Sequence, residues 1–264
     1  MSDLAYFRDV QYRDSSKLAA RANLHKRYTT APVPWHEWVT RLVPWAPEDR
    51  VLEVGCGPGW LWEEARRAVP RGLRLTLADL SVGMVTEALA RVRPLIPAAT
   101  GAVANAESLP FVGGSFGVVV ANHMLYHVPD RARAVAEFAR VLADGGVLLA
   151  ATNGPSHLHE LDEIVAEIFG ARPRRRYTER FGAHNGAELL GTRFGSVRWY
   201  DYVDDLVCTN PDDLLAYVVS APPGERATDD EILRLRDAIT SRLDAAGGAL
   251  RLTRESGAFV CRVA

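Results

Sequence analysis

The sequence predicts a doubly wound α/β fold whose seven-stranded, mostly parallel sheet carries an N-terminal helical lid and a helical insertion after strand five. Three observations lead to this fold class. From residue 50 onward, short apolar segments alternate with helical patterns, as successive β-α-β units do. The run 118–121 (Val-Val-Val-Ala) is typical of a strand buried on both faces. A glycine-rich turn at 55–59 separates the first strand from the next helix, where open α/β sheets bind ligands.

The composition is that of an ordinary globular enzyme: 264 residues, 48% hydrophobic and 24% charged, with a formal net charge of -2. Basic residues are not in excess, so we expect no nucleic-acid partner. Cys56, Cys208 and Cys261 lie far apart and form no metal-ligand spacing, so we expect a reducing compartment and no metal. Without a secretory signal or a membrane-length apolar run, we expect a cytoplasmic monomer or homodimer with no membrane partner.

Residues 1–49 are expected to form an N-terminal arm and a helical lid. Residues 1–14 are polar with scattered aromatics and suggest a flexible arm. A helix is predicted over 15–29, with Asp14 or Ser15 as its N-cap. A short helix around 35–43 follows and is ended by prolines. One stripe of the first helix contains Leu18, Arg21, Ala22, His25 and Tyr28.

Residues 50–153 are expected to form the core of the fold. Ser81 is a suitable N-cap for one of its helices, and Pro129 suits the start of another. The predicted strands are 50–54, 73–80, 101–106, 116–122 and 147–153, and the predicted helices are 60–69, 82–92 and 129–143.

The alternation of strand and helix stops after residue 153. The segment 154–195 is predicted as an insertion that covers the substrate, with helices at 156–169 and 184–191 around a basic irregular stretch. The C-terminal part, 196–264, completes the sheet. It is expected to contain a strand at 197–206, helices at 211–219 and 228–246, and a last strand at 249–263 that is broken near Ser256-Gly257.

The strongest chemical signal is the pattern E-x-G-x-G-x-G formed by Glu53, Gly55, Gly57 and Gly59. Glycines let the backbone turn tightly and approach a ligand, and the N-terminus of the following helix favours an anion. This suits the carboxylate of a methionine moiety, whose ammonium Glu53 would face. A dinucleotide-binding site would have a glycine where this chain has Trp60, and an indole there would crowd a pyrophosphate.

Three further motifs follow in order. Asp79 ends the second strand, where an acid accepts from both hydroxyls of a ribose. The segment 105–111 (Asn-Ala-Glu-Ser-Leu-Pro-Phe) follows the third strand, and 116–128 contains the fourth strand and its exit. Together with the glycine turn, these motifs resemble class I S-adenosylmethionine-dependent methyltransferases, which have a Rossmann-like fold, in the branch with many small-molecule and quinone methyltransferases. Segments at both ends of the chain, 11–28 and 252–260, are similar to a bacterial subgroup of these enzymes.

The resemblance implies a set of contacts with S-adenosyl-L-methionine, whose product is S-adenosyl-L-homocysteine. An N-terminal helix folds over the cofactor in related enzymes, so Arg21 would meet its carboxylate. The family usually has Asp where this chain has Asn105, which leaves open whether Asn105 or Glu107 contacts the adenine edge. The implied cofactor residues are Glu53, Gly55, Cys56, Gly57 and Gly59 for the methionine moiety, Asp79 for the ribose, Leu80, Met84, Asn105, Ala106 and Glu107 for the adenine, and Asn122, His123, Tyr12, Arg21 and Tyr28 around them.

Methyl transfer to a small-molecule metabolite, as in specialised metabolism, is the predicted reaction. It requires alignment and a proton acceptor but no metal. The exit of strand four supplies the first catalytic candidates, Asn122, Tyr126 and His127, with His127 the favoured base and His25 a second candidate. Either histidine also fits a capping or packing role. Asn153 and the basic stretch with Arg176 and Tyr177 are candidates for binding the substrate, an anionic group in the latter case, although a solvated loop is the simpler explanation.

Three other functions stay open at this point. A nicotinamide-dependent oxidoreductase is disfavoured by Trp60 and by the glycine spacing. A non-catalytic cofactor-fold binding protein, or an enzyme that uses S-adenosylmethionine for alkyl transfer or cyclisation, is compatible with the same motifs. The residues 122–125 (Asn-His-Met-Leu) are not the N/D-P-P-Y motif of adenine or glutamine amino methyltransferases.

Overall fold

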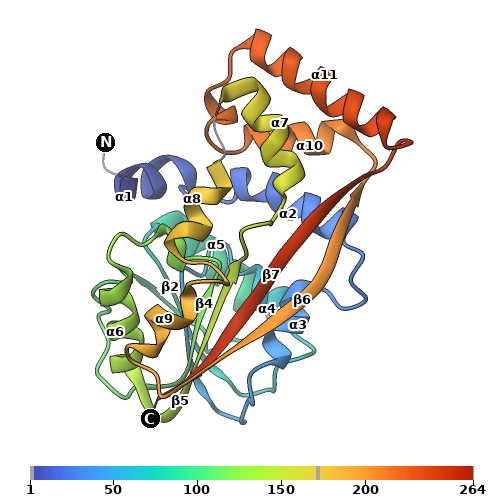
Figure 1. Ribbon diagram of the computed structural model, residues 1–264. Helices are drawn as coiled ribbons and strands as arrows, with labels where there is room; N and C mark the ends of the chain where they lie inside the picture. Colours follow the sequence, from blue (N-terminus) through green and yellow to red (C-terminus); the bar gives the residue numbers. More distant parts are fainter. Residues whose placement is uncertain (1–2, 171–172, 264) are drawn as a thin grey trace.

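The computed structural model describes residues 3–170 and 173–263 and has a seven-stranded sheet in the order β3-β2-β1-β4-β5-β7-β6 (Figure 1). Strands β1 to β5 run parallel, and β7 is antiparallel to both of its neighbours. This is the predicted doubly wound α/β fold. The strands are β1 Arg50–Val54, β2 Arg74–Asp79, β3 Thr100–Val103, β4 Phe116–Asn122, β5 Leu142–Asn153, β6 Ser196–Cys208 and β7 Leu250–Arg262.

Helices cover both faces of the sheet because the central strands are apolar on both sides. In β4, Val118 and Val120 face one core cluster, and Val119 and Ala121 face the other, as the two-residue period of a strand requires. The first cluster lies under α3 (Trp35–Arg41), α4 (Trp60–Glu64) and α5 (Val82–Val92), and the second under α6 (Arg131–Val141) and α9 (Gly186–Gly191).

A second structural region, the helical cover, extends beyond the sheet. Strands β6 and β7 are long and carry the chain upward to it in Figure 1. There α2, α7, α10 and α11 pack into a third apolar cluster, in which Leu24 of α2 is fully buried. The cover therefore has its own small core beside the carboxyl edge of the sheet. Its helices are α2 Ser16–Tyr28, α7 His159–Phe169, α8 Pro173–Arg180, α10 Pro211–Val219 and α11 Asp229–Ala245.

The N-terminal arm differs from its prediction. Residues 3–11 form two short helices, α1 (Asp3–Tyr6) and η1 (Phe7–Gln11), instead of a flexible arm. Tertiary contacts explain the order: the Gln11 amide donates to the carbonyl of Ser220 at 3.1 Å, and the Tyr6 hydroxyl donates to Glu225 near η3 (Gly224–Arg226). No local pattern reports such contacts.

Other differences concern the ends of elements. Helix α4 ends at Glu64 rather than at 69, and α6 begins only after Asp130, whose side chain caps it. The basic stretch expected to be irregular contains α8, and β7 is continuous through Ser256-Gly257 because β5 pairs with it there. The predicted cap at Ser81 is confirmed, since its hydroxyl accepts from the backbone N–H of Met84 at 3.3 Å.

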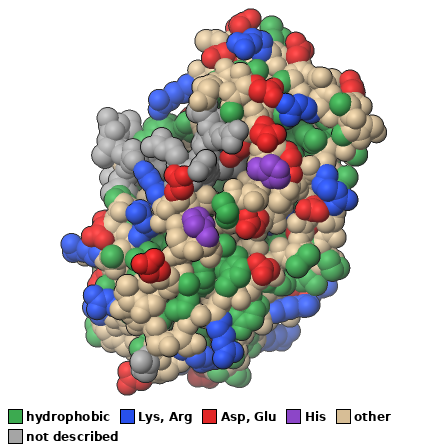
Figure 2. Space-filling model, in the orientation of Figure 1, with side chains coloured by type: hydrophobic (Ala, Val, Ile, Leu, Met, Phe, Trp, Pro, Cys, Tyr) green, Lys and Arg blue, Asp and Glu red, His purple; other side chains and the backbone are tan. Residues whose placement is uncertain are grey.

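The surface facing the viewer mixes charges of both signs (Figure 2). In the described part of the chain, no helix combines the length and the apolar character that crossing a bilayer requires.

Candidate cofactor and acceptor site

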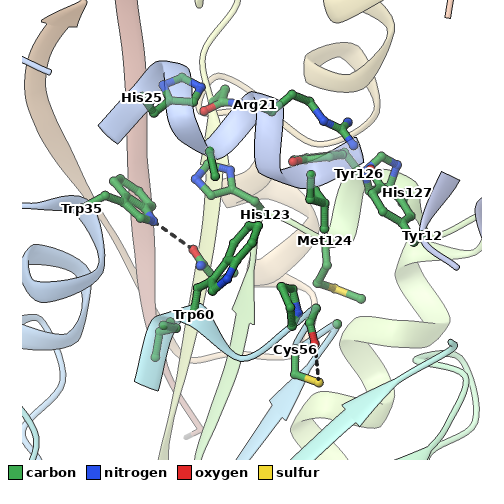
Figure 3. A pocket seen from close by; sticks show the side chains of 18 of the residues that line it. Tyr12, Arg21, His25, Trp35, Cys56, Trp60, His123, Met124, Tyr126 and His127 are labelled. Atoms are coloured by element: carbon green, nitrogen blue, oxygen red, sulfur yellow. Dashed lines mark hydrogen bonds between the residues drawn. The ribbon is translucent and has the colours of Figure 1, made fainter. Parts of the chain in front are cut away.

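A cavity of about 1050 Å³ lies between the carboxyl edge of the sheet and the helical cover. Single small-molecule sites occupy roughly 300–1,000 Å³, so this volume leaves room for a cofactor and a second small molecule. One wall comes from the exits of β1, β2, β3 and β4, and the other from α2, α10, β7 and the segments that follow β5. We call these the sheet wall and the cover wall. Figure 3 shows Arg21 and His25 of α2 on the opposite side of the cavity from Cys56.

The glycine turn forms the centre of the sheet wall. Gly55 adopts a φ of +70°, and a Cβ atom on it would lie 2.6 Å from the Cβ of Met124, so only glycine fits. Gly57 also has a positive φ, and a Cβ there would meet nothing within 4 Å, which leaves its backbone open to a ligand. Gly59 is different: it packs against Ala88 and lies outside the cavity lining, so its role is to bring two helices together.

Two acids flank the glycine turn. Asp79 accepts hydrogen bonds from the N–H groups of Gly57 at 3.0 Å and Ser81 at 2.9 Å, which fixes its carboxylate at the end of β2. Glu53 is 2% exposed and accepts from the indole N–H of Trp62 at 2.6 Å. Burial, opposed by the Trp62 hydrogen bond and assisted by the charge of Asp79, raises the pKa of Glu53 to about 8. A cation beside Glu53 would restore its ionised form.

The exit of β3 settles which side chain lines the cavity there. Asn105 and Ala106 line it, together with Leu80 and Met84. Glu107 does not; its carboxylate accepts from the N–H of Asp130 at 2.8 Å. The side-chain oxygen of Asn105 accepts from the N–H of Glu107 at 3.0 Å, which shapes the turn.

The exit of β4 brings aromatic and polar side chains into the cavity. The side-chain oxygen of Asn122 accepts from the indole of Trp35 at 3.3 Å. His123 has a φ of +54° and its ring lies 4.9 Å from that of Trp35. Burial, assisted by the charge of Arg254, lowers the pKa of His123 to about 3. Both predicted residues therefore line the cavity, together with Trp35.

Tyr12 and His127 form a hydrogen-bonded pair across the cavity. The Tyr12 hydroxyl lies 2.9 Å from Nε2 of His127, which joins the N-terminal arm to the exit of β4. The rings of Tyr126 and Tyr177 lie 4.6 and 5.2 Å from that of His127. Burial, with a contribution from the charge of Arg21, lowers the pKa of His127 to about 3, so the imidazole is neutral at physiological pH. Burial raises the pKa of Tyr126 well above its usual value.

Beside the predicted His25 and Asn153, the cover wall contains three residues that the sequence pattern did not identify: His157, Tyr217 and Ser256. His25 of α2 stacks on His157 at 5.7 Å and approaches Tyr217 of α10 at 6.1 Å. Ser256 of β7 donates to the side-chain oxygen of Asn153 at 2.7 Å. His157 follows Asn153 at a strand exit, a position that could have marked it, whereas Tyr217 and Ser256 reach the cavity only through the packing of α10 and β7.

Besides Gly59 and Glu107, two predicted site residues fall elsewhere or outside the description, namely Tyr28 and Arg176. Tyr28 lies outside the cavity lining, because its hydroxyl donates to Asp213 at 2.6 Å and its ring packs on the core of the cover. The side chain of Arg176 lies outside the described residues. Cys56 lines the cavity, and burial raises the pKa of its thiol well above the usual value, so it is a thiol in the neutral form. Within the described ranges, no cluster of three or more His, Cys, Asp or Glu side chains is arranged to bind a metal.

Comparisons with known proteins agree with this geometry. Residues 52–150 match the family model of a methyltransferase domain. A malonyl-[acyl-carrier protein] O-methyltransferase of Hahella chejuensis is 36% identical over 56% of this chain and 51% of its own length. A ubiquinone/menaquinone biosynthesis C-methyltransferase of Xanthomonas oryzae is 29% identical over 62% of this chain and 66% of its own length. The chain spans about half the length of curated relatives such as the first.

A solved structure shows the same fold with the cofactor bound. Phosphoethanolamine N-methyltransferase 2 of Haemonchus contortus, in complex with S-adenosyl-L-methionine, superposes with a TM-score of 0.60 at 18% identity. The match covers all of this chain and 60% of that one. In this chain, the open backbone at Gly57 and the carboxylate of Asp79 lie together at the glycine turn. Residues 52–150 thus match a methyltransferase domain, and the chain has the fold of an enzyme solved with S-adenosyl-L-methionine.

Proposed function

We propose that the protein transfers a methyl group from S-adenosylmethionine to a small metabolite bound under the helical cover, as an enzyme of the cytoplasm and of specialised metabolism. One observation carries the proposal: a single cavity contains both the glycine turn with Asp79 and the Tyr12–His127 pair. The first suits the family's cofactor, and the second suits an acceptor that must lose a proton.

The sheet wall would hold the cofactor. Bound S-adenosylmethionine supplies an electrophilic methyl group on a sulfonium. Glu53 would face its ammonium and Asp79 its ribose hydroxyls, while Leu80 and Met84 would lie beside the adenine. Asn105, which lines the cavity where Glu107 does not, would contact the adenine edge. The neutral Cys56 thiol takes no part as a nucleophile.

The Tyr12–His127 pair would accept the proton of the acceptor. A neutral imidazole has one basic ring nitrogen, and the Tyr12 hydroxyl 2.9 Å from Nε2 of His127 can pass a proton from the acceptor to it. Closure of α2 over the cavity would exclude water and orient the acceptor, which supplies rate through alignment. Asn122 and Tyr126 would position the acceptor beside this pair, and Asn153 and Tyr177 would line its far side.

Calorimetry tests the cofactor assignment. S-adenosylhomocysteine should bind, and NAD should show no measurable binding. NAD binding of comparable strength would contradict the methyltransferase function. Transfer of a CD3 group from labelled S-adenosylmethionine to a small molecule, followed by mass spectrometry, tests the reaction itself.

A further inference from the structure

Arg21 of α2 carries a charge that nothing in the described part of the chain neutralises. Its Nε and Nη2 atoms are buried and make no hydrogen bond. The other cations at the cavity are paired or exposed: Arg254 donates to Asp204 at 2.6 Å and Lys26 to Glu64 at 3.2 Å, while Arg66 and Arg67 lie at the surface. Among the described cations that line the cavity, Arg21 is thus the one that is buried and has no counter-ion.

The position of Arg21 assigns it to the acceptor part of the cavity. Its guanidinium lies over the Tyr12 ring at 5.6 Å, and its charge acts on Tyr126 and His127. Figure 3 shows the guanidinium beside Tyr126 and His127, with Met124 between it and the glycine turn at Cys56. The groups closest to the cation are therefore those proposed to receive the acceptor, not the acids of the sheet wall.

An unpaired buried cation raises the free energy of the ligand-free protein. Removing a guanidinium from water without a counter-ion costs free energy, which the arrival of an anion recovers. The rings around Arg21 are those of tyrosines and the neutral His127 imidazole, so they supply no counter-ion, and one negative charge is enough to balance Arg21. The charge of Arg180 also acts on His127 and adds to the attraction for an anion. The same acceptor part of the cavity is lined by aromatic rings, which suit a flat or apolar ligand. These rings belong to Tyr12, Tyr126, Tyr177 and Tyr217.

We propose that the acceptor is an organic monoanion, a carboxylate with an aromatic or apolar body, whose carboxylate Arg21 binds through its two buried nitrogens. The fork of a guanidinium matches the two oxygens of a carboxylate. The methylated atom is a different group of the same molecule, held at the Tyr12–His127 pair. This inference rests on the proposed function and specifies its substrate class.

The binding test uses the protein saturated with S-adenosylhomocysteine and needs no known acceptor. Benzoate, phenylacetate, cinnamate and hexanoate are each titrated beside their primary amides. The wild type should prefer carboxylates by about tenfold or more, and Arg21→Met should remove the preference. Arg27→Met, which removes a charge from the exposed face of the same helix, should keep it. Amides that bind as well as their acids, a preference that survives Arg21→Met, or tighter binding of phenylphosphonate than of benzoate would each overturn the proposal.

A second arm separates the acceptor from the cofactor. S-adenosylhomocysteine carries a carboxylate, and 5′-methylthioadenosine lacks it. Arg21→Met should change the affinity for both by less than about threefold and should raise the melting temperature of the ligand-free protein, because a buried unpaired charge is removed. Selective loss of affinity for S-adenosylhomocysteine would assign Arg21 to the cofactor instead. Failure of the proposed function would appear differently, as no binding of S-adenosylhomocysteine to the wild type.

A third arm identifies the product class. The enzyme is incubated with CD3-labelled S-adenosylmethionine and a bacterial metabolite extract. The labelled product should be retained on an anion exchanger at neutral pH, and its formation should fall with Arg21→Met but not with Arg27→Met. A labelled product that is neutral or cationic would overturn the proposal.

Discussion

The two walls of the cavity are built in different ways. The sheet wall uses backbone: Glu53 comes just before the turn at Gly55 and Gly57, and the parallel strands bring Asp79 to the N–H of Gly57 at 3.0 Å. The cover wall uses side chains of helices far apart in sequence, which bring together Arg21 and Tyr217. The sheet wall carries two acids, and the cover wall carries an unpaired cation. Each wall therefore suits a different ligand, a cationic cofactor on one side and an anion on the other.

The largest effect should come from the pair that joins the walls. His127→Gln and Tyr12→Phe should each lower kcat by roughly 10²–10⁴-fold, because each removes a partner in proton transfer. Initial rates with the acceptor found by CD3 labelling give the value. The affinity for S-adenosylhomocysteine should stay unchanged. The double variant should be little worse than either single variant, since the residues act as a unit; additive losses would show that they act independently.

The pH profile sharpens the same assignment. Because burial lowers the pKa of His127 to about 3, its basic form persists at every pH above that value. We expect kcat/KM to show no acidic limb from this group between pH 5.5 and 8. A limb near pH 6.5 that disappears in His127→Gln would contradict the burial of this imidazole in the free enzyme.

A second substitution attacks the backbone of the sheet wall. Gly55→Val adds a branched side chain at a φ of +70° and 2.6 Å from Met124, so overpacking and backbone strain should weaken S-adenosylhomocysteine binding by about 3 kcal/mol, roughly 150-fold. Gly114→Ala is the control, since it has a φ of +68° and open space around a Cβ. It should strain the fold without changing affinity. Equal losses in both variants would mean that general destabilisation is being measured.

Asp79→Ala should have a somewhat smaller effect. Loss of charge-assisted hydrogen bonds should cost on the order of 1.5–3 kcal/mol, which weakens the cofactor about 10- to 150-fold in calorimetry. Glu107→Ala is a matched control, because Glu107 lies outside the cavity lining. Normal cofactor binding by Asp79→Ala would remove this acid from the cofactor site.

The smallest expected effect is the release of a proton from Glu53 when the cofactor product binds. With its pKa raised to about 8, Glu53 is largely protonated in the free protein at pH 7. The cofactor's ammonium should ionise it, so S-adenosylhomocysteine binding should release about 0.9 proton at pH 7, measured by calorimetry in buffers of different ionisation enthalpy. Glu53→Gln should release none.

The raised pKa of Glu53 also sets how the stability of the ligand-free protein changes with pH. The stabilisation from protonated Glu53 is complete below about pH 4.5 and is lost as the pH rises through 8, so the ligand-free wild type should lose stability over that range relative to Glu53→Gln. Melting temperatures of both proteins across the range give the difference. Parallel curves would show that Glu53 is already ionised.

The sequence could predict the sheet wall because its signals are local. Gly55, Asp79 and His127 follow strands in a fixed order, and the parallel sheet brings strand ends to one edge. The cover wall has no such rule. Tyr28 and Arg21 share the stripe of one predicted helix, yet packing turns Tyr28 toward Asp213 and Arg21 into the cavity. The order of the N-terminal arm likewise depends on Glu225, more than 200 residues away.

Asp204 of β6 has a consequence for cooperativity. This buried carboxylate accepts from the backbone N–H groups of Thr30 at 2.8 Å and Ala31 at 2.9 Å, from the Thr29 hydroxyl at 2.8 Å, and from Arg254 of β7 at 2.6 Å. The end of α2 and two strands therefore share one anion. Local unfolding of the cover would remove the donors at Thr29, Thr30 and Ala31 and leave the Asp204 carboxylate without them. Sheet and cover, which look like separate parts of the ribbon, are for this reason expected to melt in a single calorimetric transition.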